Sequence, residues 1–408
     1  MKIHPLFNKL LVVMIVTLQS KTTAAPSVPL ARLCHWPEGR PFALFLSHDV
    51  DQIHDRELFR LLADANHIRR RLTSSEPGSM GLAGLRMARS IFQPKPAQKD
   101  FETLLAIEGR HGFRSTFFLR RDKSRARQGR RYSLQCREIQ KVGRMILDAG
   151  SELGIHGGYY HFNDAKLYRE SLEAMESAFG VRPCGIRNHL LHFSYPETWR
   201  AQAAAKFAYD ATYGLSGELG PRGGWPFPFQ TCDANTGEFL NLLELPMTVM
   251  DATLFRHLRL GGEAALEKAW QAVAGVIGVG GLVSLLWHNN YFNEREYRDW
   301  QMVYEELLNR LAPLKPWCAT GAEINAWWRA KAAVVMRTFP GAAGKTKIEI
   351  LSPQAITGLA LEIQSTHEVQ LPAANVQQES VDGRTRIYFP CLPAGETITL
   401  KVTTRFGS

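Results

Sequence analysis

From residue 40 onward the sequence alternates short, largely apolar runs with longer amphipathic stretches, and this alternation restricts the fold more than any other feature. Runs such as 42–46, 115–119 and 282–288 suit strands that are buried on both faces of a parallel sheet. The stretches 134–149 and 263–276 have the spacing of amphipathic helices. A repeat of this kind predicts an α/β domain in which the strand ends share one face.

The pattern changes near residue 336. Residues 347–350, 386–389 and 397–402 alternate apolar and polar side chains, as strands with one buried face do. We therefore expect a distorted (β/α) barrel over residues 26–335, followed by a small antiparallel β domain over residues 336–408. This second domain carries no catalytic constellation, so we expect an accessory or packing role for it.

The first 25 residues have the order of a signal peptide. Lys2 and Lys9 precede the apolar run 10–16, and small residues follow at 22–25. The run is shorter than the roughly 20 residues of a membrane-spanning helix, and no other segment could span a membrane. The protein is thus expected to be exported or periplasmic if the segment is a signal, and cytoplasmic if it is an amphipathic tail or reflects a wrong start codon.

Composition excludes several classes of protein. The chain has 408 residues, 45% hydrophobic and 22% charged, which is typical of a globular protein. Its formal net charge is +10, but the basic runs at 67–71 and 120–131 lack the aromatic interleaving of a nucleic-acid binder, so we expect no nucleic-acid partner. The six cysteines are scattered without metal-ligand spacing or a disulfide pattern.

Four predicted strands end in chemically useful side chains. Because side chains alternate along a strand, Asp49 and Asp51 should leave on the same side. Two carboxylates placed together need a metal, another cation or a shared proton, although a solvated turn is the plainer reading of this pair alone. Several such ends converging on one face of a barrel indicate a hydrolytic metal site. The groups are Asp49 and Asp51, His156 with His161, Arg187 with His189, and His288.

Over about residues 40–330, ordered motifs resemble the polysaccharide deacetylases of the NodB-homology type. The matching segments are Ser47-His48-Asp49-Val50-Asp51, His156-Gly157-Gly158-Tyr159-Tyr160-His161, Gly185-Ile186-Arg187 and Leu286-Trp287-His288. The match is closer still to a subgroup with a His-Asp-Val-Asp first motif, whose members often accompany surface-polysaccharide biosynthesis.

The resemblance implies a role for each matching residue. It makes Asp49 the catalytic base, Arg187 the residue that orients this base, and His288 the general acid. It makes Asp51, His156 and His161 the ligands of a divalent metal.

The chain departs from the family pattern at two places. Val50 separates the paired carboxylates, so either Asp49 or Asp51 could be the base and the other the ligand. The two histidines are five residues apart instead of four, so a loop at 157–158 would have to restore their convergence, and His189 is the alternative third ligand. Zinc best suits two histidines and one aspartate, and cobalt, nickel or iron are also compatible.

Weaker signals concern the substrate. Trp225, after Arg222, could belong to a wall that stacks on sugars, and the alternative is a packed loop. Asp210, at another strand end, could hold Arg187 or contact the substrate, as could His189. We expect metal-dependent removal of an N-acyl group, N-acetyl above all, from an amino sugar of a polysaccharide or its precursor. The alternatives are a deformylase or another amidase of non-peptide C–N bonds on the same fold, and a carbohydrate-binding pseudoenzyme.

Overall fold

A computed structural model describes residues 31–51, 53, 98–121, 132–160, 162–292, 297–341, 345–364, 367–371 and 376–404. These residues divide into two compact units. The first to be described contains residues 40–222 and 226–329, and the other contains 31–39, 223–225 and the chain from 330 onward. The expected signal segment 1–25 and the basic run 67–71 lie outside the described residues.

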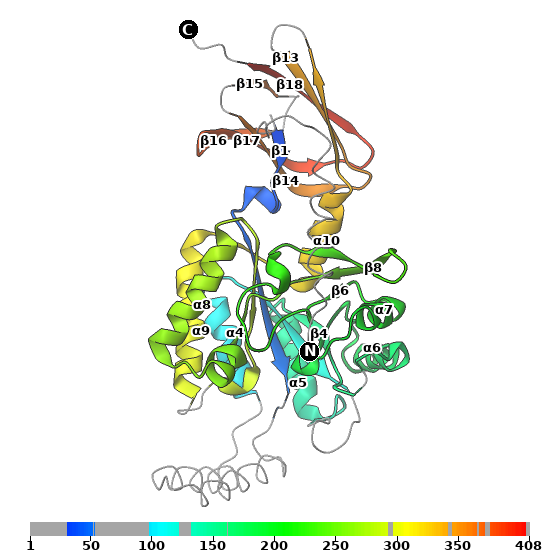
Figure 1. Ribbon diagram of the computed structural model, residues 1–408, viewed down its shortest axis with the longest axis vertical. Coiled ribbons are helices and arrows are strands. Elements are labelled where there is room, and N and C mark those ends of the chain that lie inside the picture. The colour runs from blue at the N-terminus through cyan, green and yellow to red at the C-terminus, as the bar shows by residue number, and fades with distance from the viewer. Residues whose placement is uncertain are drawn as a thin grey trace, which may run out of the picture. The chain divides into compact units, whose positions relative to one another are not determined.

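The larger unit is an α/β domain around one sheet, which is mostly parallel and curled into an incompletely closed barrel (Figure 1). The strand order is β7-β8-β6-β5-β4-β3-β2-β10-β9, with β11 also paired to β2; only β7 is antiparallel to its neighbour. The strands are β2 (Ala43–Val50), β3 (Ser115–Arg120), β4 (Glu152–Gly157), β5 (Gly185–Asn188), β6 (Tyr209–Asp210), β7 (Phe229–Cys232), β8 (Phe239–Glu244), β9 (Val249–Met250), β10 (Leu282–Leu286) and β11 (Trp317–Cys318).

Helices cover this sheet, with α8 and α9 along one flank and α6 and α7 along the other (Figure 1). The helices are α4 (Lys99–Gly109), α5 (Arg137–Asp148), α6 (Ala165–Phe179), α7 (Glu197–Ala204), α8 (Gly262–Ile277), α9 (Arg298–Leu311) and α10 (Gly321–Ala332). Local sequence sets their limits: the Asp164 carboxylate caps the start of α6, and Gly180 ends that helix with φ 71°.

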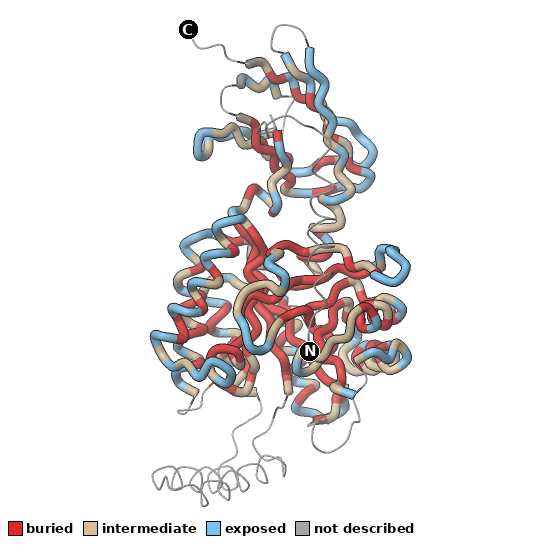
Figure 2. Tube along the Cα trace, viewed as in Figure 1, coloured by how far each residue is buried: buried red, intermediate tan, exposed pale blue. Residues whose placement is uncertain are grey.

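The core lies between the sheet and these helices. The sheet is the most buried part of this unit (Figure 2). Every residue of β2 is buried, and Val303, Leu307 and Leu311 of α9 are buried at helical spacing. The predicted strand 42–46 is therefore longer than its apolar run, because Ser47, His48 and Asp49 are also buried.

The smaller unit consists of two antiparallel sheets. Their orders are β1-β14-β17-β16 and β12-β13-β18-β15. The strands are β1 (Ala31–Leu33), β12 (Val335–Pro340), β13 (Lys345–Leu351), β14 (Ile356–Gln364), β15 (His367–Gln370), β16 (Gln377–Val381), β17 (Arg384–Leu392) and β18 (Thr397–Thr404). The α/β fold with separate antiparallel sheets agrees with the sequence-based expectation, but residues 31–39 group with the β domain instead of the barrel.

Parallel registers bring the strand ends of the α/β unit to one edge. Arg120 at the end of β3 pairs with His156 on β4, and His156 pairs with Arg187 on β5. On the other side of β2, Ser47 pairs with Leu286 of β10. Side chains just beyond these positions must therefore meet.

Candidate metal and active site

Three ligand-type side chains meet at the carboxyl ends of β2, β4 and β5. Asp51 Oδ1 lies 3.5 Å from His156 Nε2 and 3.4 Å from His189 Nε2. The ligand atoms of the three residues all lie within 4.8 Å of one another. One carboxylate and two imidazoles are a set that zinc and related divalent metals accept, with positions left open for water and substrate. The group could therefore bind a metal.

Local backbone geometry explains why His189 joins this group. It begins a short 3₁₀ turn, His189–Leu191, directly after β5. Leu190 and Leu191 in that turn have φ values of 57° and 52°, a left-handed conformation that leucine rarely adopts. Beside them β4 and β5 approach so closely that a Cβ on Gly157 would lie 2.0 Å from the Asn188 side-chain oxygen, so a larger residue there would displace the Asn188 side chain.

His156 is prepared to bind through its Nε2 atom. Its Nδ1 lies 3.0 Å from the Arg187 carbonyl oxygen. A carbonyl can only accept, so Nδ1 is the donor in this bond and Nε2 is the ring nitrogen left to face a metal. Nε2 is buried and has no hydrogen-bond partner among the described residues. A metal ion at this position would satisfy it.

Protonation of the other two groups also favours metal binding. Burial alone would raise the pKa of Asp51, but the adjacent imidazoles of His189 and His156 outweigh it and hold the pKa well below the usual value. Burial lowers the pKa of His189, against the opposing charge of Asp51. An ionised carboxylate and a neutral imidazole are the forms that ligate a metal.

Arg120 is a component of the site that the sequence did not reveal. Its side chain is 2% exposed and its Nη1 lies 3.4 Å from Asp51 Oδ1. The same carboxylate oxygen thus faces one guanidinium and two imidazoles. In the sequence Arg120 opens the basic run 120–131, whose pattern does not distinguish a buried arginine from a solvated one.

Asp49 lies beside the cluster and is paired with a buried arginine. Arg187 Nη1 lies 3.2 Å from Asp49 Oδ1 and donates to Ser47 Oγ at 2.9 Å. Arg187 Nε donates to the Ala211 carbonyl at 3.0 Å, and the guanidinium lies 4.5 Å from the centre of the Phe118 ring. Asp49 Oδ2 is 3.8 Å from His156 Nδ1, so Asp49 and Asp51 both face the same imidazole, as the alternation along the strand predicted.

His288 approaches the cluster from β10 and is held by Asp251. The Asp251 carboxylate faces His288 Nδ1 at 2.8 Å and accepts its backbone N–H at 2.7 Å. Burial would lower the pKa of His288, but Asp251, followed by Asp49 and Asp51, raises it to about 9. The imidazole is therefore protonated at neutral pH. Asp251 stands at a strand end like the other groups, directly after β9, and that position was the signal for it in the sequence.

The remaining predicted residues lie in different surroundings. His161 lies outside the described residues; among the described residues, His189 joins the cluster. Asp210 is fully buried against the backbone and hydroxyl of Thr212, a position that does not favour a substrate contact. Arg222 stacks 4.4 Å from the Tyr213 ring centre. Trp225 belongs to the smaller compact unit.

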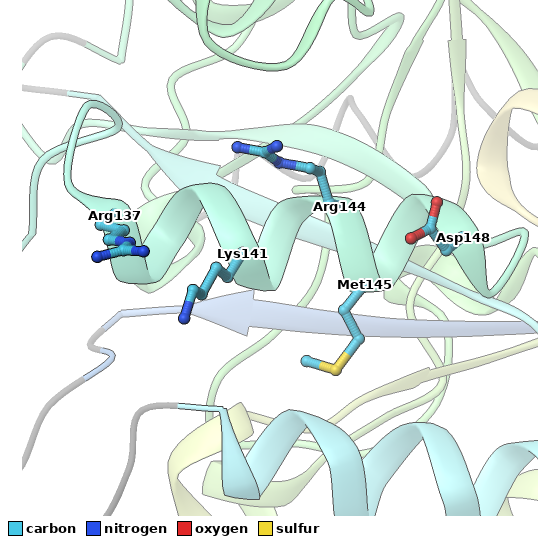
Figure 3. A pocket seen from close by; sticks show the side chains of 5 residues that line it. All are labelled: Arg137, Lys141, Arg144, Met145 and Asp148. Carbon is cyan, nitrogen blue, oxygen red and sulfur yellow. The ribbon is translucent and has the colours of Figure 1, made fainter.

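A separate hollow of about 540 Å³ lies along α5 (Figure 3). Its lining residues are Arg137, Lys141, Arg144, Met145 and Asp148. It contains none of the predicted site residues. Within the described part of the chain, no helix is long and apolar enough to cross a membrane.

Solved structures of polysaccharide deacetylases share part of this architecture. A Mycobacterium smegmatis protein assigned as a polysaccharide deacetylase is 21% identical, with a TM-score of 0.47, and the match covers 76% of this chain and 96% of that one. The peptidoglycan deacetylase PdaC of Bacillus subtilis is 11% identical, with a TM-score of 0.37, covering 72% and 94%. A CE4 family pseudoenzyme from Bacillus anthracis is 12% identical, with a TM-score of 0.35, covering 69% and 65%.

No protein-family model and no curated protein matches the sequence.

Proposed function

We propose that this protein is a metal-dependent hydrolase that removes an N-acyl group, with N-acetyl expected, from an amino sugar of a polysaccharide or its precursor. The observation that supports this most directly is the Asp51–His156–His189 group. Two further side chains beside it are suited to accept and to donate a proton. Asp49 is a carboxylate paired with a cation, and His288 is an imidazole paired with a carboxylate. Hydrolysis of an amide needs such a base and such an acid.

Asp49 serves as the base in this proposal. Its carboxylate accepts a proton from the attacking water, and the Arg187 guanidinium is paired with it. Hydrogen bonds to Ser47 Oγ and to the Ala211 carbonyl fix the Arg187 guanidinium, so its positive charge is held beside Asp49.

His288 serves as the acid. Asp251 holds Nδ1, which leaves Nε2 as the atom that donates a proton to the departing amine. While it is protonated, the same imidazole stabilises the negative charge that develops on the acyl oxygen. The acid and the base thus come from neighbouring strands, β10 and β2.

Asp51, His156 and His189 would hold the metal, with zinc as the first candidate and cobalt, nickel or iron as others. When bound, a divalent ion lowers the pKa of a coordinated water and polarises the acyl oxygen. The motif resemblance supports an N-acylated carbohydrate as the substrate.

The test is acyl release from defined oligosaccharides of N-acetylated amino sugars, with the metal-loaded protein. Asp49→Asn and His288→Ala should each lower kcat by about 100-fold or more, because each removes a proton-transfer group. Both variants should keep their metal, and KM should change little, because proton transfer stabilises the transition state.

The controls separate the alternatives. Release of formate from N-formylated substrates, with none of acetate from acetylated ones, would establish the deformylase. Sugar binding without acyl release at any of the four metals would establish the carbohydrate-binding pseudoenzyme. Loss of metal in Asp49→Asn would exchange the roles of Asp49 and Asp51.

A further inference from the structure

His48 precedes Asp49 on β2, and its buried side chain forms a bridge that links β2 to α4 and to the segment directly after β10. Its Nδ1 lies 2.9 Å from the Trp287 carbonyl oxygen, and its Nε2 lies 2.8 Å from Glu108 Oε1 on α4. The imidazole is fully buried and packs on the Phe117 ring, with centroids 4.7 Å apart. None of these residues contributes to the proposed chemistry.

Glu108 is held as firmly as His48. Tyr304 of α9 donates to its Oε1 at 2.5 Å, and Ser115 donates to its Oε2 at 2.7 Å. Glu108 is 1% exposed. The carboxylate therefore anchors His48 Nε2 to two helices and to β3. Breaking a buried pair of this kind is costly, so its geometry is well defined.

The bridge stands where β2 and β10 stop pairing. Their parallel ladder ends at the Ser47–Leu286 pair, followed by a bond from Trp287 N–H to the Ser47 carbonyl. Beyond this point β2 continues beside β3 as far as Val50. The carbonyl of Trp287, directly after β10, accepts its hydrogen bond from the His48 side chain.

The two residues that follow the bridge are the proposed base and the proposed acid. Asp49 comes directly after His48, and His288 comes directly after Trp287. A hydrogen bond from His48 Nδ1 to the Trp287 carbonyl thus joins the two backbones one residue before each proton-transfer group.

We propose that His48 is a positioning residue: its Nδ1 bond to Trp287 sets the separation of Asp49 and His288, while Glu108 holds the ring in place. This inference rests on the proposed function, because it assigns those two residues to one reaction. Misplacement of reacting groups by about 1 Å can cost about 100-fold in rate. His48 is therefore expected to affect kcat without touching the substrate.

Two substitutions separate the two bonds of the imidazole. An asparagine amide nitrogen occupies roughly the place of Nδ1, and a glutamine amide nitrogen roughly that of Nε2. His48→Asn should keep the bond to Trp287 and lose Glu108, whereas His48→Gln should keep Glu108 and lose Trp287. Tyr304→Phe is the matched control, because it weakens the anchor of Glu108 and leaves the Trp287 bond intact.

We expect His48→Gln to lower kcat by about 10- to 100-fold with little change in KM, and His48→Asn and Tyr304→Phe to stay within about threefold of the wild type. All assays are made well below the melting temperature of each variant. A purely structural role predicts instead that the loss of rate follows the loss of thermal stability in all three variants.

A second measurement does not depend on activity. The His288 backbone N–H donates to Asp251, and its hydrogen exchange reports the position of that residue. His48→Gln should speed this exchange by about tenfold or more beyond any change in global stability, and His48→Asn should not. Equal exchange and equal rates in His48→Gln and His48→Asn would overturn the inference. If the wild type shows no deacetylation, the proposed function fails, and the exchange data still decide the role of His48.

Discussion

At the scale of single residues, three nitrogen atoms of different side chains surround one carboxylate oxygen of the site. Asp51 Oδ1 faces Arg120 Nη1, His156 Nε2 and His189 Nε2 at 3.4, 3.5 and 3.4 Å. A carboxylate surrounded in this way stays ionised, and its imidazole neighbours are already close enough to share an ion with it. Substitution of His189, the third ligand-type residue of this group, is the most informative test of the metal site.

We predict that the purified protein binds about one divalent metal per chain, and that His189→Ala loses it as completely as His156→Ala. His161→Ala should keep it, because Asp51, His156 and His189 already supply three ligand atoms within the described residues. Metal analysis after dialysis measures this. Full metal content in His189→Ala with loss in His161→Ala would restore the ligand set that the motif resemblance implied.

A second residue-scale prediction concerns pH. The pKa of His288 is about 9, and burial opposes this value while Asp251 is the largest cause that raises it. Only the protonated imidazole donates, so activity should fall as the pH rises through about 9. Asp251→Asn removes the raising charge and should move this alkaline limb to lower pH. Glu263→Gln, at an exposed position of α8, is the control. An unmoved limb in Asp251→Asn would mean that another group titrates there.

Strand ends explain which site residues could be predicted from sequence. Asp49, Asp51, His156, Arg187 and His288 each follow or end a recognisable apolar run, so their convergence could be expected. His189 lies in the metal-ligand group beside two leucines, Leu190 and Leu191, whose backbone has positive φ. Sequence pattern does not predict that backbone conformation. Arg120 could not be identified because a buried arginine and a solvated one look alike in a basic run.

At the scale of elements, β6, β8 and α7 enclose two buried acids. Asp210 and Glu244 are register neighbours on β6 and β8, and Trp199 of α7 donates to Glu244 at 2.9 Å. Burial raises the pKa of Asp210 to about 6 and, together with the charge of Asp210, raises that of Glu244 well above its usual value. Ala211, next in the chain, holds Arg187 through its carbonyl. The acid pair thus underlies the loop that supports the proposed base.

This pair should make stability depend on pH. Both acids hold protons more tightly in the folded state than in the unfolded chain. Their contribution is therefore complete below about pH 4, the unfolded value; that of Asp210 is lost as the pH rises through about 6, and that of Glu244 as the pH rises through its own raised pKa. Asp210→Asn removes one of these titrations, so its melting temperature relative to the wild type should be higher at pH 8 than at pH 4.5. Thermal unfolding at both values measures this, and an identical difference at the two pH values would contradict it.

Apolar patterning located most of these elements but not their full length. β2 extends to Val50 because its polar residues have hydrogen-bond partners in and directly after β10. The Ser47 hydroxyl donates to the Leu285 carbonyl, and the His48 ring bonds the Trp287 carbonyl, so both side chains can be buried within a strand. Hydrogen bonds between distant segments decide such limits, and local sequence does not contain them.

At the scale of the whole molecule, the smaller unit is assembled from both ends of the described chain. β1 pairs with β14 so that Ala31 lies opposite Ile363 and Leu33 opposite Leu361. Arg32 and Arg386 both bind the Glu362 carboxylate, at 2.7 Å each. The sequence predicted this unit from its alternating strands, but its first strand is too short and too far away in the chain to be assigned from pattern alone.

Two truncations test this arrangement together with the export that we propose for the leader. Removal of residues 1–25 should leave a folded and active protein, because β1 begins at Ala31. Removal of residues 1–36 takes β1 away from the buried Leu361 and Ile363, and should lower the melting temperature by about 5 °C or more. Calorimetry measures both. Equal stability of the two truncated proteins would show that β1 is dispensable, and an alkaline-phosphatase fusion reports whether residues 1–25 direct export.

The pairing of β1 with β14 also has a consequence for biosynthesis. The ion pair between Arg32 and Glu362 joins residues 330 positions apart, so a ribosome must make nearly the entire polypeptide before the earliest described strand can find its neighbour. Contacts of such long range form late and slowly. Newly made chains should therefore pass through a stage in which the α/β unit has been synthesised and β1 still lacks its partner strand, and during that stage the nascent protein is exposed to proteases and chaperones.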